Sequence, residues 1–147
     1  MSEITRNTPM APGPALDWAL DDAVGHVPEA LNAVLFSTDG FAKARSSGLD
    51  KETAERTAAA GSALLSMAKG TAEVLGDPKE TPLREALFHY RGGYLLLVQA
   101  GEGACVGVSA TERVDVEVFT TRVHLLVKRL GEVMSSRQRD DIGSRPA

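Results

Sequence analysis

The sequence has little cysteine and few aromatic residues. Cys105 is the one cysteine among 147 residues, so the chain cannot form an internal disulfide or a cysteine-based metal cluster. It lies in an apolar, strand-like run, which predicts a buried and inert thiol. Aromatic side chains make up 5% of the residues and leave little ring surface for stacking against a small ligand.

An excess of positive charge and long apolar runs are also lacking. The formal net charge of -4 and the pI near 5.4 provide no broad field for phosphate backbones, which argues against nucleic-acid binding. No apolar run approaches the roughly 20 residues that a membrane-spanning helix needs. The start of the chain lacks the apolar core of a signal peptide. These absences predict a cytoplasmic protein without membrane insertion.

Sequence patterns of catalytic chemistry are missing as well. His26, His89 and His124 lie far apart in the sequence, and no HExxH or Cys/His pattern joins them. Ser109 lacks the G-x-S-x-G elbow of a hydrolase, and the glycines of 101–107 are one residue off the dinucleotide-binding spacing. There is no P-loop sequence either. We therefore expect no catalytic residue, no metal site and no cofactor, so that any nucleotide-binding protein involved would be a partner.

The segment 49–76 has the most informative pattern, a long helix with apolar residues on two faces. Asp50 is a typical N-cap and Glu52 suits the positive first turn, while Gly76 before an Asp-Pro pair predicts the end of the helix. At 100° per residue, one stripe is expected to pack on a sheet: Ala54, Ala58, Gly61, Leu64, Leu65, Ala68, Ala72 and Leu75.

The second stripe lies roughly 140° around the helix from the first. Its mostly small members are Arg56, Ala59, Ala60, Ala63, Met67, Gly70 and Val74. One domain of this length has few elements left to cover a second face, so we predict a homodimer in which the helix meets its own copy. A central helix of a larger monomeric core remains the alternative. The polar positions Glu55, Ser62, Ser66, Lys69 and Glu73 are left to face water.

Prolines, glycines and apolar periodicity predict the order of the other elements. We expect helices over 16–27 and 114–134 and strands over 31–38, 41–46, 84–91, 94–100 and 104–109. The segments 1–14 and 136–147 lack a periodic apolar pattern and are predicted to be disordered tails. The domain therefore spans 15–135, with the order helix, strand, strand, helix, three strands, helix.

Several short motifs, in this order and spacing, resemble one family. They are Leu16-Asp17-Trp18 with Asp21, Phe36-Ser37-Thr38-Asp39-Gly40, Ser46-Ser47-Gly48-Leu49-Asp50, Arg91-Gly92-Gly93-Tyr94, Gly101-Glu102-Gly103-Ala104-Cys105 and Leu125-Leu126-Val127-Lys128-Arg129-Leu130-Gly131. The chain resembles a bacterial roadblock protein of the dynein light chain family, of the kind encoded in conservons. The match covers about 15–135.

The resemblance implies a roadblock/profilin-like α+β sandwich. In such a fold, a five-stranded antiparallel sheet has the long helix on one face and the terminal helices on the other. It also implies a homodimer formed by the long helix and the edge strand 84–91, which adds Leu87 and His89 to the second stripe as interface residues. Pairing of that strand with its copy would remove an exposed sheet edge.

Family members bind Ras-like small GTPases as activators or scaffolds. The resemblance therefore implies a non-enzymatic regulator whose partners are its own copy, a Ras-like small GTPase and, in conservons, a sensor-kinase-like membrane protein. We expect Glu55, Ser62, Ser66 and Lys69 to bind the GTPase. Arg56 is interpreted as a partner of Glu52 or Glu55 rather than as a catalytic arginine. The alternatives are a small-ligand sensor of similar architecture and a pure adaptor without effect on nucleotide turnover.

Overall fold

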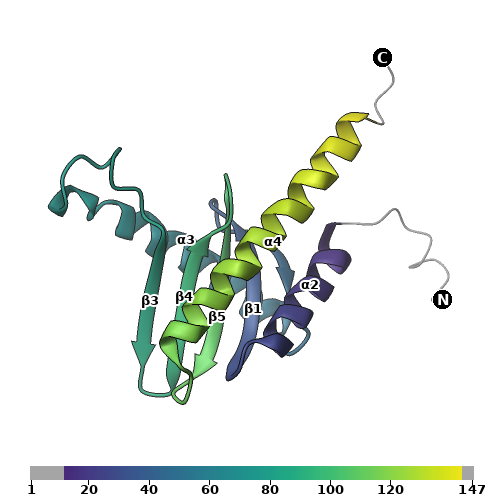
Figure 1. The fold of residues 1–147 in the computed structure, drawn as a ribbon, viewed down its shortest axis with the longest axis horizontal. Helices are drawn as coiled ribbons and strands as arrows, with labels where there is room; N and C mark the ends of the chain where they lie inside the picture. The colour runs from purple at the N-terminus through teal and green to yellow at the C-terminus, as the bar shows by residue number, and fades with distance from the viewer. Residues whose placement is uncertain (1–11, 144–147) are drawn as a thin grey trace.

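The computed structural model describes residues 12–143 and contains a five-stranded sheet between two helical layers (Figure 1). The elements follow in the order α2 (Pro12–His26), β1 (Ala30–Ser37), β2 (Ala42–Arg45), α3 (Lys51–Lys69), the 3-10 turn η1 (Ala72–Val74), β3 (Glu85–Tyr90), β4 (Gly93–Gln99), β5 (Ala104–Thr111) and α4 (Val116–Gly143). This order confirms the predicted fold class.

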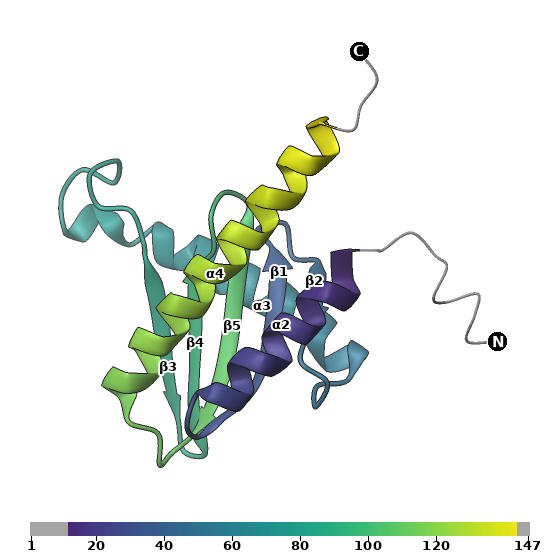
Figure 2. The ribbon, with the colours of Figure 1, turned by 45° about the vertical axis from the view of Figure 1, so that its right-hand side comes forward.

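All neighbouring strands in the sheet are antiparallel, and their spatial order is β2-β1-β5-β4-β3. Helices α2 and α4 lie on one face of the sheet and α3 lies on the other (Figures 1 and 2). The first and last strands in the chain, β1 and β5, pair in the middle of the sheet. The edges are consequently β2 and β3, which come from the two hairpins.

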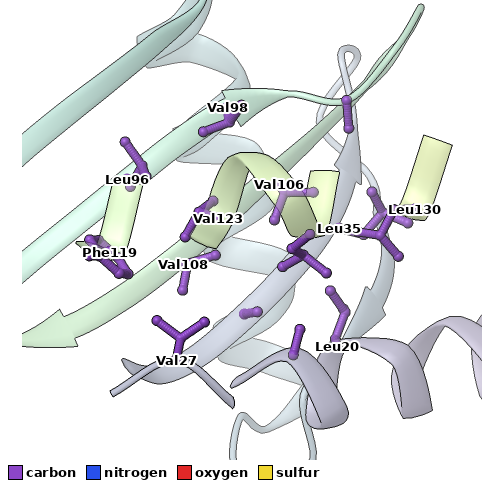
Figure 3. Close-up of a cluster of buried hydrophobic side chains, with 14 of the residues drawn as sticks. Leu20, Val27, Leu35, Leu96, Val98, Val106, Val108, Phe119, Val123 and Leu130 are labelled. Atoms are coloured by element: carbon purple, nitrogen blue, oxygen red, sulfur yellow. The ribbon is translucent and has the colours of Figure 1, made fainter. Parts of the chain in front are cut away.

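The larger apolar core lies between the sheet and the helices α2 and α4 (Figure 3). Its members include Leu20 of α2 and Val27 just after that helix, with Phe119, Val123 and Leu130 of α4. Alternate residues of the strands meet them, including Leu35, Leu96, Val98, Val106 and Val108. Side chains of a strand point alternately to its two faces, so each strand supplies this core with every second residue.

A smaller core lies under α3 and confirms most of the predicted sheet-facing stripe. Ala54, Ala58, Gly61 and Leu65 are the buried residues of this helix. A Cβ added to Gly61 would lie 2.8 Å from Cζ of Phe36, so the missing side chain lets the helix approach that ring. Cys105 belongs to the same core and is buried as predicted.

Helix α3 begins as predicted but ends earlier. The N–H of Thr53 donates to Oδ1 of Asp50 at 2.7 Å, which confirms the N-cap. The helix stops at Lys69 because Gly70 and Thr71 have low helix propensity, and the Thr71 hydroxyl instead donates to the carbonyl of Ala68 at 2.7 Å. The prediction of one helix to Gly76 was therefore wrong. Leu75, expected against the sheet, is 78% exposed.

Both terminal helices extend past the predicted domain limits. Helix α4 continues to Gly143 rather than ending at Met134, because the segment 135–142 contains good helix formers and no Gly or Pro. Helix α2 begins at Pro12, since proline is tolerated in the first turn of a helix. The remaining parts of the predicted tails, 1–11 and 144–147, lie outside the described residues. Among residues 12–143, we find no helix with the length and apolarity of a membrane span.

Candidate dimer and partner-binding surface

The β2 edge of the sheet is closed by side chains of α2. The N–H of Arg45 donates to Oδ1 of Asp17, and the N–H of Ser47 donates to Oδ1 of Asp21, each at 2.7 Å. The N–H of Ser46, between them, donates to the carbonyl of Ala33 in β1. The outward N–H groups of Arg45 and Ser47 therefore already have partners, and β2 is also only 4 residues long.

The β3 edge has no such cover within the described part of the chain. The N–H of Gln99 in β4 donates to the carbonyl of Arg84 just before β3. Since hydrogen-bonded and non-bonded pairs alternate along an antiparallel ladder, the N–H groups of Glu85, Leu87 and His89 point away from β4. β3 contains neither lysine nor proline, the residues that commonly protect an edge. This edge is therefore open to a further strand.

The second stripe of α3 is accessible in the single chain. Arg56, Ala59, Ala60, Ala63, Met67, Gly70 and Val74 are all exposed. Met67 is 64% exposed and Val74 is 86% exposed, although α3 no longer includes Val74. Ala59 lies beside the β1–β2 turn, because a Cβ added to Gly40 would be 3.6 Å from its Cα. Ala59 is thus on the flank of α3 that borders β2.

Arg56 forms a local ion pair, as the sequence predicts. Its Nη2 lies 2.7 Å from Oε1 of Glu52, one turn earlier on the same helix. Both side chains are exposed, so the pair contributes little to stability.

Leu87 and His89 belong to the open edge but face away from α3. The His89 ring stacks on Tyr94, which packs against the core under α2 and α4. Glu85, on the same face of β3, meets His124 of α4 at 2.8 Å. Phe88 instead packs against the core under α3. The alternation of side chains along a strand provides this signal in the sequence: the even-numbered residues of β3 share the face of α3. One of them is Tyr90, which is not among the predicted interface residues.

The predicted GTPase-binding residues are brought together in part. Ser62, Ser66 and Lys69 line a shallow pocket of about 240 Å³ beside Thr38 and Cys105. The Ser62 hydroxyl donates to the carbonyl of Thr38 and so ties α3 to the end of β1. Burial raises the pKa of the Cys105 thiol, with a smaller opposing effect from Lys69.

Glu55, the fourth predicted residue, lies apart from the other three. It lines a different pocket with Lys51, and its carboxylate is 3.9 Å from Nζ of that lysine. The polar flank of α3 therefore has two ends, of which only the C-terminal one forms a cluster.

The three histidines do not converge on a common site. His26 contacts Asp22 within α2, His89 stacks on Tyr94, and His124 meets Glu85. Across the described residues, no group of three or more His, Cys, Asp or Glu side chains could hold a metal ion. The features that stand out are instead an open strand edge and an uncovered helix face, which are typical of a protein-binding module.

Comparisons with known proteins agree with this class. Residues 16–110 match the family model of the Roadblock/LC7 domain. A crystal structure of a Roadblock/LC7 domain from Streptomyces avermitilis is similar at 30% identity and a TM-score of 0.75, covering 81% of this chain and 97% of that one. The chain belongs to the Roadblock/LC7 family.

More distant structures share the fold. MglB from Myxococcus xanthus is similar at 12% identity and a TM-score of 0.73, covering 84% of this chain and 97% of that one. Profilin IA from Acanthamoeba castellanii is similar at 14% identity and a TM-score of 0.56, with 79% and 96% covered. No curated protein sequence gives a significant match.

Proposed function

We propose that this protein is a non-enzymatic homodimer that binds a Ras-like small GTPase in the cytoplasm of a bacterium and regulates or positions it. Membership of the Roadblock/LC7 family supports the GTPase as partner. The observation that carries the homodimer is the coincidence of an open β3 edge with the uncovered stripe of α3. In a conservon, a sensor-kinase-like membrane protein would be a further partner.

The two features would be covered by one symmetric contact. Two β3 strands that pair antiparallel about a twofold axis continue the sheet from one copy into the other and satisfy the outward N–H groups. The same axis brings the two α3 helices side by side on one face of the joined sheet. The small side chains Ala60 and Ala63 would let the helices approach closely, and Met67 would be buried between them.

A glutamate at Met67 tests the homodimer. Met67→Glu would place an unpaired carboxylate in the contact, so we expect it to convert dimers into monomers. Light scattering over a range of protein concentrations measures the mass. Leu125→Glu is the matched control, because Leu125 is exposed to a similar degree but lies on α4. A dimer that survives Met67→Glu with unchanged affinity would show that this face is not the interface.

The GTPase is expected to bind the polar flank of the paired α3 helices. Ser66 is exposed at the centre of the C-terminal cluster, with Lys69 one turn further on. We expect Ser66→Arg to weaken binding at least about tenfold, which corresponds to about 1.4 kcal/mol. Thr121→Arg, at an exposed site on α4, is the control. If Ser66→Arg and Thr121→Arg bind the GTPase with equal affinity, the GTPase-binding site lies elsewhere on the protein.

Nucleotide turnover separates a regulator from an adaptor. A Ras-like GTPase encoded beside this chain would be purified, loaded with GDP or GTP, and mixed with the protein. A regulator changes the rate of GTP hydrolysis or of nucleotide exchange, whereas an adaptor binds and changes neither. Arg56→Ala should retain any stimulation, since we assign Arg56 to a local ion pair. If the protein binds the GTPase in neither its GDP-bound nor its GTP-bound state, the proposed function is contradicted.

A further inference from the structure

The segment 70–84, here called the arm, joins α3 to β3 and projects past the β3 edge of the sheet in both views (Figures 1 and 2). It includes η1, whose last residue Val74 is 86% exposed, and the following residue Leu75, which is 78% exposed. These are the highest exposures of large apolar side chains among the residues that the structure describes. Two such neighbours on a projecting segment indicate a surface that a partner covers.

An apolar groove of about 430 Å³ lies on the α3 face of the sheet. Val34, Leu95 and Gly107 of three strands line it, and Thr57 of α3 forms part of its wall. Tyr90, the last residue of β3, also lines the groove and is 55% exposed. Helix α3 packs mainly on β1, β2 and β5, which leaves this groove uncovered toward β4 and β3.

The arm and the groove lie at opposite ends of β3. The arm leads directly into Glu85 at the start of the strand, whereas the groove adjoins Tyr90 at its end. Five steps of about 3.4 Å separate these residues by about 17 Å. Leu75 lines a pocket with Arg84 and Glu85, so it is remote from Tyr90 of its own chain. Antiparallel pairing of two β3 strands reverses this relation, because the start of one strand then lies beside the end of the other.

We propose that the arm of each copy packs on the other copy, with Val74 and Leu75 against the groove beside the partner's Tyr90. This inference rests on the proposed homodimer. It adds Leu75, Tyr90 and the groove to the strand pairing and to the helix stripe, which already contains Val74. The two contacts are equivalent under the twofold axis. They would cover the most exposed apolar side chains of the arm and close the groove at the same time.

The charges of the two surfaces are complementary. The arm carries three acids, Glu73, Asp77 and Glu80, and two bases, Lys79 and Arg84, so it has an excess of one negative charge. Arg91 follows Tyr90 in the β3–β4 turn and is exposed. Antiparallel pairing therefore brings a cationic turn of one copy to an acidic arm of the other, which favours this occupant of the groove over an unrelated apolar segment.

Chemical cross-linking tests the contact between the two chains. Leu75→Cys and Tyr90→Cys would be combined in a Cys105→Ala background and treated with a short bis-maleimide. A covalent dimer is expected, since a short linker cannot span the distance within one chain. The control pair, Leu75→Cys with Lys43→Cys, places the second thiol on the closed β2 edge and should give no covalent dimer.

A second test changes the arm and leaves the residues of the groove unchanged. Leu75→Asp should raise the dimer dissociation constant at least about tenfold, because both contacts of the dimer lose a buried leucine. Leu125→Asp, on α4, should leave this constant unchanged. A wild-type dimer that neither cross-links through 75 and 90 nor responds to Leu75→Asp would overturn the arm contact alone. A monomeric wild type would overturn the homodimer as well and would leave the groove to another occupant.

Discussion

The strands β2 and β3 are the two edges of one sheet, but the chain protects them differently. β2 is short, and carboxylates of α2 accept hydrogen bonds from the backbone of Arg45 and Ser47 at its outer side. β3 is longer and apolar at Leu87 and Phe88, and its outward N–H groups meet no strand or side chain of the described residues. A single chain thus closes one edge and leaves the other available.

The same asymmetry continues on the helical faces. Two helices cover the sheet on the α2 and α4 side, whereas α3 alone lies on the opposite face and packs mainly on β1, β2 and β5. Of the eleven large apolar side chains that are exposed in the described part, five belong to α3, the arm and β3: Met67, Val74, Leu75, Leu87 and Tyr90. Unpaired backbone and uncovered apolar surface therefore occur together. Their coincidence is what distinguishes an interface from scattered exposed residues.

The largest expected effect comes from removing one outward N–H at the open edge. Leu87→Pro leaves the β4 ladder intact, because the N–H of Leu87 points away from it, but blocks pairing with a second β3. We expect the dimer dissociation constant to rise about a hundredfold, which corresponds to about 3 kcal/mol. Sedimentation velocity measures association, and circular dichroism checks that the monomer remains folded.

Phe88→Pro provides the contrast to Leu87→Pro. The N–H of Phe88 points toward β4, so this change should unfold the chain rather than only dissociate it. If Leu87→Pro forms dimers with wild-type affinity, β3 does not join the two copies of the chain.

A smaller effect is expected from opening the closed edge. Asp17→Ala leaves the half-buried N–H of Arg45 without its partner and should lower the free energy of unfolding by about 1–2 kcal/mol. Asp22→Ala, on the same helix, removes only exposed contacts of 3.6 and 3.9 Å and should cost less than about 0.5 kcal/mol. Urea unfolding at one fixed protein concentration compares the two. Equal losses would mean that Asp17 does not protect the edge.

The smallest effect concerns the link between the open strand and α4. His124 meets Glu85 at 2.8 Å, with both side chains more than a third exposed. We expect His124→Ala to change the free energy of unfolding by at most about 0.5 kcal/mol and to leave association unaffected. The same urea and sedimentation measurements apply. A loss of the dimer in this variant would assign the α4 contact a role in holding β3 for pairing.

Local patterns predicted the elements because each signal lies within a few residues. The spacing of Ala54, Ala58, Gly61 and Leu65 identified the buried face of α3, and Asp50 identified its start. The break after Lys69 could not be placed in the same way. Single Gly and Thr residues are tolerated in helices, and the competing hydrogen bond of Thr71 is a property of the folded chain.

The features that distinguish the two edges depend on distant parts of the sequence. Asp21 and Asp22 resemble a solvated pair in the sequence, yet Asp21 contacts a backbone N–H 26 residues away. The faces of Leu87 and His89 depend on the position of α4 across the sheet, which no local pattern fixes. The stripe of Ala60, Ala63 and Met67 is recognisable from the sequence because a second apolar face of a helix is a local signal.

Hydrogen exchange at individual backbone amides tests most directly whether β3 is the edge that joins two copies. We predict that the N–H groups of Leu87 and His89 are protected in the wild type at high protein concentration. They should lose this protection on dilution or in Met67→Glu. The N–H of Arg45, held by Asp17, should keep its protection throughout. Fast exchange of Leu87 and His89 at every concentration would contradict the account.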